Sequence, residues 1–180
     1  MCLTLAGLLA CLLMQHNSLP GHSSHELEIR GARIEDCVAL RALLIDTYRG
    51  TWLPQLSVEA AQAFEREDRL GQYVNEAWEQ FWIAARDQQV CGMVHWRDDF
   101  IEALHVSRTH QGMGIGSRLL ELAEQQMAAA SVRLFRLETD TFNTQSLAFY
   151  RKHGYQEIDR YPDTEWNSDF TTVLMHKQRH

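Results

Sequence analysis

Apolar and polar positions in the first 80 residues follow two different periods. Residues 26–30 alternate charged and apolar side chains, which predicts a half-buried strand. Apolar residues then recur at helical spacing over residues 37–48, and Gly50 offers a stop. A second helical region covers residues 57–79 and is broken near residues 68–71. The chain therefore opens with a strand followed by helices, and the stretch around Trp52 between them is predicted to be a loop that exposes an aromatic side chain.

The middle of the chain changes to short β-rich runs separated by polar turns. These runs cover residues 82–86, 89–96 and 100–106. Their short turns predict an antiparallel meander. An amphipathic helix follows from Ile115 to about Ala130, and residues 134–138 form the next predicted strand. A strand, a helix and a strand joined in this way predict one parallel, right-handed crossover.

The end of the chain adds a short helix and two strands. The helix is predicted at residues 146–152 and is closed by Gly154, and the strands lie near residues 155–160 and 170–175. We therefore predict one mixed α/β domain over residues 26–180, with a mostly antiparallel sheet.

Residues 1–25 are predicted to be an apolar, flexible N-terminal extension. Their apolar run, residues 3–14, is too short for the roughly 20 residues that span a bilayer. No Lys or Arg precedes Arg30, so the basic start of a signal peptide is missing. Translation from Met14, a packed extension and export remain as alternative interpretations of this segment.

Composition excludes some functions. The net charge of −7 opposes binding to nucleic acid, which depends on Lys and Arg contacts to phosphates. The four cysteines form no CxxC pair and are too sparse for a disulfide framework, which favours a reducing, cytoplasmic location. His22 and His25 have no partner ligands nearby in the sequence, so we expect no metal.

A glycine cluster at residues 111–116 lies between a predicted strand and a predicted helix. Backbone N–H groups at such a junction point outward, and together with the helix dipole they suit a pyrophosphate. A glycine-rich turn that serves only geometry is the structural alternative. A GxxxxGK[ST] phosphate loop needs a lysine that residues 112–117 lack, and a GxGxxG fingerprint would place Ser117 at its third glycine.

The cluster resembles the signature of the GNAT family of N-acetyltransferases, Gln/Arg-x-x-Gly-x-Gly/Ala. Gln111, Gly114 and Gly116 match its fixed positions. A second family element appears as Asn143 followed by residues 146–155, Ser-Leu-Ala-Phe-Tyr-Arg-Lys-His-Gly-Tyr. The resemblance covers roughly residues 26–176 and implies the GNAT fold and an acetyl-CoA-dependent N-acetyltransferase.

The resemblance also implies how acetyl-CoA is held. Backbone groups at the end of the fourth strand would pair with the pantetheine arm, and the amides of the glycine cluster would take the pyrophosphate. One of these backbone amides, for which Val106 is the candidate, would polarise the thioester carbonyl. The implied cofactor-binding residues are Leu104, His105, Val106, Gln111, Gly112, Met113, Gly114, Ile115, Gly116, Ser117, Asn143, Tyr150 and Lys152. Asn143 has helix capping as an alternative role.

Acetyl transfer needs a base for the amine and an acid for the departing thiolate. Tyr150 matches the tyrosine that serves as the acid in the family, and a phenol is protonated at pH 7. Packing in the core is its alternative role. Glu102 is the candidate base, since some family members carry a glutamate nine residues before the Gln111 position. His105 and His110 are rivals by chemistry. Strand alternation predicts that Glu102 shares a face with Leu104 and Val106 and that His105 points away from it.

By resemblance, the acceptor pocket lies between the loop around Tyr48 and Trp52 and the connection formed by residues 159–169. Four carboxylates against one arginine in that connection favour a substrate with an ammonium group, and a solvated acidic loop is the alternative. The expected partners are a small-molecule or peptide amine and a second copy of the chain, with no nucleic acid and no membrane. An acyl-CoA sensor of the same fold and a toxin acting on aminoacyl-tRNA are the competing functions.

Overall fold

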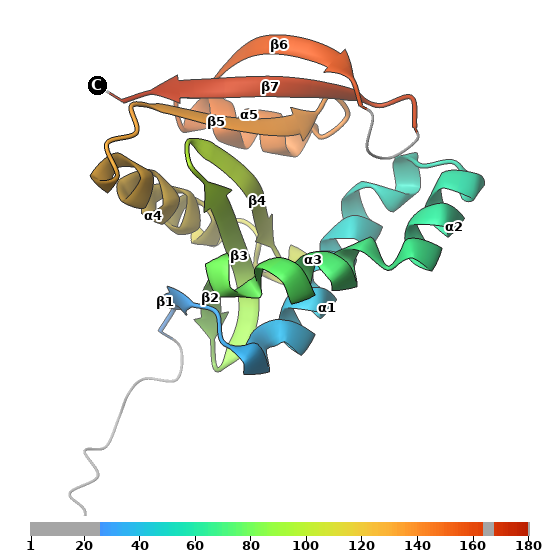
Figure 1. Ribbon diagram of the computed structural model, residues 1–180, viewed down its shortest axis with the longest axis horizontal. Helices are drawn as coiled ribbons and strands as arrows, with labels where there is room; N and C mark the ends of the chain where they lie inside the picture. Colours follow the sequence, from blue (N-terminus) through green and yellow to red (C-terminus); the bar gives the residue numbers. More distant parts are fainter. Residues whose placement is uncertain (1–25, 164–167, 180) are drawn as a thin grey trace, which may run out of the picture.

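A computed structural model describes residues 26–163 and 168–179, which form a seven-stranded sheet with helices on both faces (Figure 1). The strands are β1 Glu28–Gly31, β2 Trp82–Arg86, β3 Gln89–Arg97, β4 Phe100–Val106, β5 Leu134–Asp140, β6 Gln156–Pro162 and β7 Thr171–Gln178. The α-helices are α1 Cys37–Thr51, α2 Val58–Glu67, α3 Arg69–Ala77, α4 Ile115–Ala129 and α5 Thr144–Lys152. The expectations for residues 1–25 and for Glu165 lie outside the described residues.

The strand order is β1-β2-β3-β4-β5-β7-β6, and every pair is antiparallel except β4 with β5. The predicted mixed sheet with one parallel crossover is confirmed. The parallel pairing joins Phe100 to Arg136 and Ile101 to Leu137, and beyond it the two strands separate. An ion pair of 2.7 Å between Arg136 and Asp99 closes the narrow end of this split. Figure 1 shows β5, β7 and β6 running at a steep angle to β2, β3 and β4.

Two apolar cores hold the helices on the sheet. One core packs α4 and α5 against it, with Leu119, Met127, Leu147 and Tyr150 among its buried residues. The other core packs α1 and α3 against the opposite face of β2 and β3. Because α1 and α5 approach the split from different sides, they border the space that opens there.

Local backbone conformation and side-chain capping explain where several of the predicted helices and strands begin and end. The helical region after Ser57 breaks at Asp68, which adopts a left-handed conformation with φ of 46° between α2 and α3. The Ser57 side chain accepts a hydrogen bond from the amide of Ala60 and so caps α2. Asp87 and Gln88 have φ of 51° and 64°, as a two-residue hairpin turn requires.

Gly92 in β3 allows α4 to lie close against the sheet. A Cβ at this position would stand 3.0 Å from the Leu119 side chain and 3.1 Å from both the Ile115 side chain and the His105 carbonyl. We expect Gly92→Ala to lower the free energy of unfolding by about 1–3 kcal/mol, measured by urea denaturation, because the packed core must shift. Gly31→Ala is the matched control, since a Cβ there meets nothing within 4 Å. Equal stability of both variants would contradict this account.

Candidate active site

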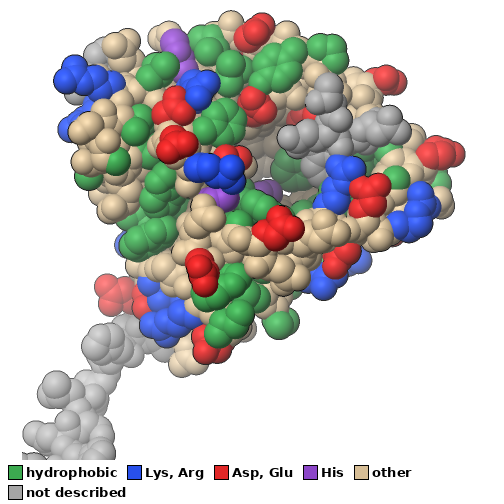
Figure 2. Space-filling view, viewed as in Figure 1, with side chains coloured by type: hydrophobic (Ala, Val, Ile, Leu, Met, Phe, Trp, Pro, Cys, Tyr) green, Lys and Arg blue, Asp and Glu red, His purple; other side chains and the backbone are tan. Residues whose placement is uncertain are grey.

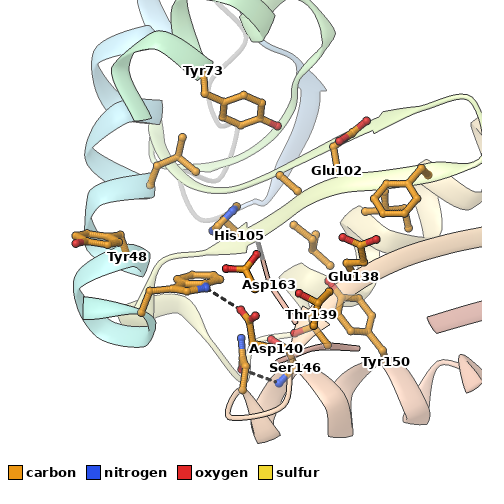
Figure 3. Close-up of a pocket in the computed structure, with 18 of the residues that line it drawn as sticks. Tyr48, Tyr73, Glu102, His105, Glu138, Thr139, Asp140, Ser146, Tyr150 and Asp163 are labelled. Carbon is orange, nitrogen blue, oxygen red and sulfur yellow. Dashed lines mark hydrogen bonds between the residues drawn. The ribbon is translucent and has the colours of Figure 1, made fainter. Parts of the chain in front are cut away.

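The split between β4 and β5 contains two cavities that meet. The larger has a volume of about 540 Å³ and the smaller about 350 Å³. The residues that line both are Trp52, Leu104, His105, Asn143, Ser146 and Tyr150. Figure 3 shows several of them around the larger cavity, and the face drawn in Figure 2 is hollowed near its middle, with a histidine beside acidic and hydrophobic side chains.

The smaller cavity follows the end of β4, the start of α4 and α5. It is lined by every predicted cofactor-binding residue except Met113, whose side chain is 53% exposed and contacts Arg86. Lys152 lines this cavity, and none of the described residues around it is an aspartate or a glutamate. The lining is therefore suited to an anion.

The start of α4 presents unpaired backbone amides to the smaller cavity. Gly112 and Gly114 have φ of 76° and 78°, which non-glycine residues rarely adopt. The Arg118 amide donates the first hydrogen bond of the helix, to the Gly114 carbonyl at 3.1 Å. The preceding amides, at residues 115–117, have no intrahelical acceptor and lie at the positive end of the helix dipole. The amides of residues 115–117 therefore lie at the wall of the smaller cavity with no acceptor from within the helix.

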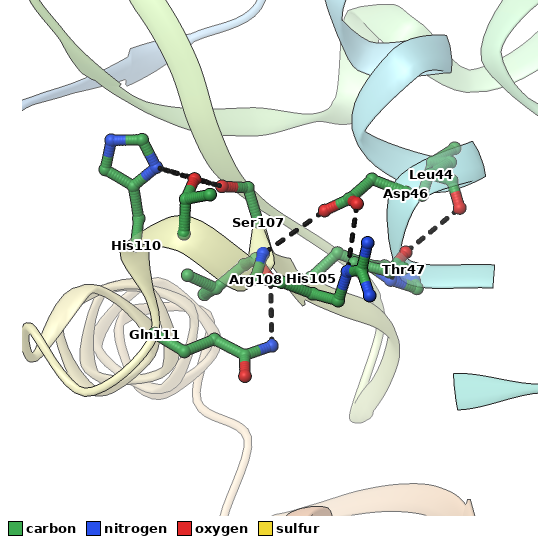
Figure 4. Close-up of polar contacts among 10 residues, drawn as sticks. Leu44, Asp46, Thr47, His105, Ser107, Arg108, His110 and Gln111 are labelled. Carbon is green, nitrogen blue, oxygen red and sulfur yellow. Dashed lines mark hydrogen bonds and ion pairs between the residues drawn. The ribbon is translucent and has the colours of Figure 1, made fainter. Parts of the chain in front are cut away.

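The edge of β4 also presents backbone groups to the split. The Ser107 amide donates to the Cys91 carbonyl at 2.9 Å, on the β3 side. Since successive residues of a strand point their amides to opposite sides, the Val106 amide faces the split. The Val106 carbonyl accepts a hydrogen bond of 3.2 Å from the Gln111 side chain, so Gln111 fixes the end of β4 (Figure 4).

Tyr150 and Asn143 both lie where the cavities meet. Tyr150 is 7% exposed, and its ring packs edge-on against Phe149 and Tyr155. Burial raises the pKa of the Tyr150 hydroxyl well above its usual value. The Asn143 side chain accepts from the Ser146 amide at 3.1 Å, so the capping role is observed.

The larger cavity combines aromatic rings with carboxylates. Its aromatic residues are Tyr48, Trp52, Tyr73, Phe100, Tyr150 and Tyr161, and its acidic residues are Glu102, Glu138, Asp140 and Asp163. The described lining includes no lysine or arginine. From the predicted connection 159–169, only residues 161–163 reach this lining among those described. The cavity therefore suits a cationic group.

The prediction of an exposed aromatic loop at Trp52 is wrong. Trp52 is half-buried, and its indole N–H donates to the Asp140 carboxylate at 2.9 Å. This contact ties the end of α1 to the end of β5 across the split. Residue spacing within the loop carries no signal for a partner that lies 88 positions away.

The predicted opposite orientation of Glu102 and His105 is also wrong, because β4 contains a bulge. His95 pairs with Ala103 and Trp96 pairs with Ile101, so Glu102 is an extra residue that interrupts the alternation. Both Glu102 and His105 line the larger cavity, as Figure 3 shows. Burial and, to a smaller degree, the Glu102 charge raise the pKa of Tyr73 on α3. Glu102 therefore lies on the α3 side of the sheet.

Some residues that line the cavities were not predicted from the sequence, and four of them carry polar or titratable side chains that matter for the chemistry. Thr47 and His153 line the smaller cavity, and Tyr73 and Glu138 line the larger. His153 lies in the second family element and accepts or donates a hydrogen bond with Ser117 at 3.0 Å. Its place in that element is a signal that could have found it, whereas Thr47, Tyr73 and Glu138 stand in ordinary helix and strand patterns.

Across residues 26–163 and 168–179, no cluster of three or more His, Cys, Asp or Glu is placed to hold a metal ion. In the same ranges, no helix has the length and apolar character that a bilayer crossing requires.

Comparison with known sequences gives one family match and two partial relatives. The model of the Acetyltransferase (GNAT) family matches residues 38–155. The uncharacterized protein YxbD of Bacillus subtilis (strain 168) is 33% identical over 76 residues, 41% of this chain and 47% of that protein. An IAA acetyltransferase of Azospirillum brasilense is 34% identical over 77 residues, 43% of this chain and 49% of that protein. The chain thus spans about half the length of these curated relatives.

Solved structures share the fold over most of the chain. The PaiA N-acetyltransferase of Thermoplasma acidophilum, in complex with coenzyme A, has a TM-score of 0.69 at 22% identity, covering 86% of this chain and 99% of that one. YncA of Salmonella typhimurium, with acetyl-CoA, has a TM-score of 0.63 at 16% identity, covering 84% and 93%. At these identities the likeness shows the fold.

Proposed function

Since this chain belongs to the GNAT family of acetyltransferases, we propose that it transfers the acetyl group of acetyl-CoA to a cationic primary amine by direct attack in a ternary complex. The observation that carries the proposal is the pair of cavities that meet at Tyr150. One has a lining suited to phosphates and the other a lining suited to an ammonium group. The thioester and the amine would meet between them.

Acetyl-CoA fits the smaller cavity in two respects. The amides of residues 115–117 would hold the pyrophosphate, and backbone groups of Leu104 and Val106 would pair with the pantetheine arm. The Val106 amide would then donate to the thioester oxygen as negative charge develops there. In other enzymes, removal of such a donor lowers the rate by about 10²–10³-fold.

Gly114→Ala should weaken acetyl-CoA binding by about tenfold or more, measured by isothermal titration calorimetry. Alanine strains the left-handed conformation by about 1–2 kcal/mol and displaces the first amides of α4. Gly154→Ala is the matched control, because Gly154 has φ of 88° and lines neither cavity. Equal acetyl-CoA affinity of the two variants would argue against the phosphate cradle.

The acceptor is proposed to carry positive charge because the described residues that line the larger cavity include four carboxylates and six aromatic side chains. A polyamine, an aminoglycoside, or a lysine or N-terminal amine of a peptide satisfies this requirement. Aromatic faces stabilise ammonium groups by about 0.5–2 kcal/mol. Glu102, the candidate base, stands in this lining and lies 3.8 Å from Arg97.

The test is thiol release from acetyl-CoA, followed with a chromogenic reagent across polyamines, aminoglycosides, amino acids and peptides. Release that depends on one amine class would support the proposal and identify the acceptor. Acetyl-CoA binding without release for any amine would favour the alternative function of an acyl-CoA sensor. A toxin acting on aminoacyl-tRNA requires tRNA binding at low salt, which the same preparation can test.

A further inference from the structure

Two titratable side chains lie at the meeting point of the cavities. Six residues line both cavities. Among them, Tyr150 and His105 have side chains that can donate or accept a proton. Of the two cavities, Glu102 lines only the larger one. His105 therefore lines the region where the two cavities meet, whereas the glutamate that the sequence favoured does not.

A hydrogen-bond chain fixes which nitrogen of His105 carries the proton (Figure 4). Thr47 Oγ1 lies 3.0 Å from the Leu44 carbonyl oxygen and 2.9 Å from His105 Nδ1. A carbonyl oxygen only accepts, so the single hydroxyl proton of Thr47 is donated to Leu44. His105 must then donate its Nδ1–H to Thr47. A neutral imidazole has one proton, which leaves a lone pair on Nε2.

We propose that His105 Nε2 is the general base that takes the proton from the acceptor amine, and that Thr47 positions it by holding Nδ1–H. This inference rests on the proposed acetyl transfer and names a residue for one of its steps. The ammonium group first loses one proton to solvent water. The lone pair of the resulting neutral amine forms the C–N bond, and the carbonyl π electrons move to oxygen. Nε2 takes one N–H proton. When the carbonyl reforms, the C–S bond breaks, and the thiolate takes the proton of the Tyr150 hydroxyl.

The surroundings of His105 keep the ring neutral before attack. Burial lowers the pKa of His105 to about 4, so Nε2 is unprotonated at pH 7. An imidazole of this kind cannot deprotonate a free ammonium group with a pKa near 10. The amine nitrogen becomes far more acidic once it is bonded to the tetrahedral carbon. Nε2 therefore acts during attack, and the carboxylates of the larger cavity attract the amine beforehand.

His105→Gln should lower kcat by about 100-fold, as loss of a general base does, with the Kd for acetyl-CoA unchanged. The backbone of residue 105 is retained, so cofactor contacts through the main chain persist. His176→Gln, on β7 and outside both cavity linings, is the matched control and should keep full activity. Release by wild type and equally by His105→Gln would overturn the base assignment alone. No release by wild type with any amine would overturn the proposed function and this inference together.

Thr47 gives a second, independent test. Thr47→Val removes the hydroxyl from a side chain of the same shape, and we expect a loss of about tenfold in kcat. Thr47→Ser should restore most of that activity. In a double variant with His105→Gln, Thr47→Val should cause no additional loss, since Thr47 acts through His105. Additive losses in the double variant, or a Thr47→Ser variant as slow as Thr47→Val, would overturn the positioning role even if His105→Gln folded poorly.

Discussion

Replacing Tyr150 with phenylalanine should lower kcat by about 100-fold or more while the affinity for acetyl-CoA stays unchanged. The reason is that the departing thiolate loses its proton donor, and general acid catalysis contributes about 10²–10⁴ in rate. The phenylalanine ring keeps the edge-on packing against Phe149 and Tyr155. Stopped-flow thiol release and calorimetric titration with acetyl-CoA measure the two quantities separately.

Tyr155→Phe is the matched control, since Tyr155 belongs to the same core and lines neither cavity. It should retain wild-type turnover. A Tyr150→Phe variant with normal kcat would restrict Tyr150 to the packing role. Loss of turnover with binding intact would exclude the sensor, which has no turnover to lose.

The raised pKa of Tyr150 has a consequence for pH dependence. Burial disfavours the charged phenolate and raises the pKa of the Tyr150 hydroxyl above its usual value near 10. The hydroxyl therefore stays protonated at any pH below this raised pKa. The acid form is lost only as the pH rises through that raised pKa. We therefore expect kcat to show no decline from Tyr150 ionisation up to about pH 10, where an unperturbed phenol would be half ionised. A decline centred near pH 8 that disappears in Tyr150→Phe would contradict this.

Elements with strong periodic signals were predictable from the sequence. The amphipathic spacing of α4 and the short polar turns around β2 and β3 define these elements locally, and the structure confirms them. The glycine cluster was predictable for the same reason, since positive φ at Gly112 and Gly114 is a local requirement. Local chemistry therefore predicted the backbone conformation at the start of α4.

The larger cavity was harder to predict, because its lining depends on contacts between distant segments. The bulge at Glu102 arises from pairing with β3, and strand alternation alone gives the wrong face for that residue. The bond between Thr47 and His105 joins residues 58 positions apart. Nothing in the helical pattern around Thr47 distinguishes it from a core threonine. Orientation in this cavity is decided by tertiary packing, which single-sequence periodicity does not contain.

Removing negative charge from the larger cavity should weaken the binding of a cationic acceptor. Glu102→Gln combined with Asp163→Asn should raise KM for a cationic acceptor by about 100-fold, with kcat changed little. Each carboxylate within a few ångström of an ammonium group contributes about 1–2 kcal/mol in a partly exposed site, which is close to tenfold in affinity. Initial rates over a range of acceptor concentrations measure this directly.

A matched pair of substitutions separates the cavity from the net charge of the protein. Glu59→Gln with Glu121→Gln changes the net charge by the same amount on α2 and α4, outside both linings, and should leave KM within about twofold. The effect of the cavity pair should shrink as ionic strength rises, because salt screens partly exposed charges. If Glu102→Gln alone lowers kcat and leaves KM unchanged, Glu102 takes part in proton transfer, as the sequence predicted. A rise in KM at constant kcat instead assigns Glu102 to binding the ammonium group and leaves the proton to His105.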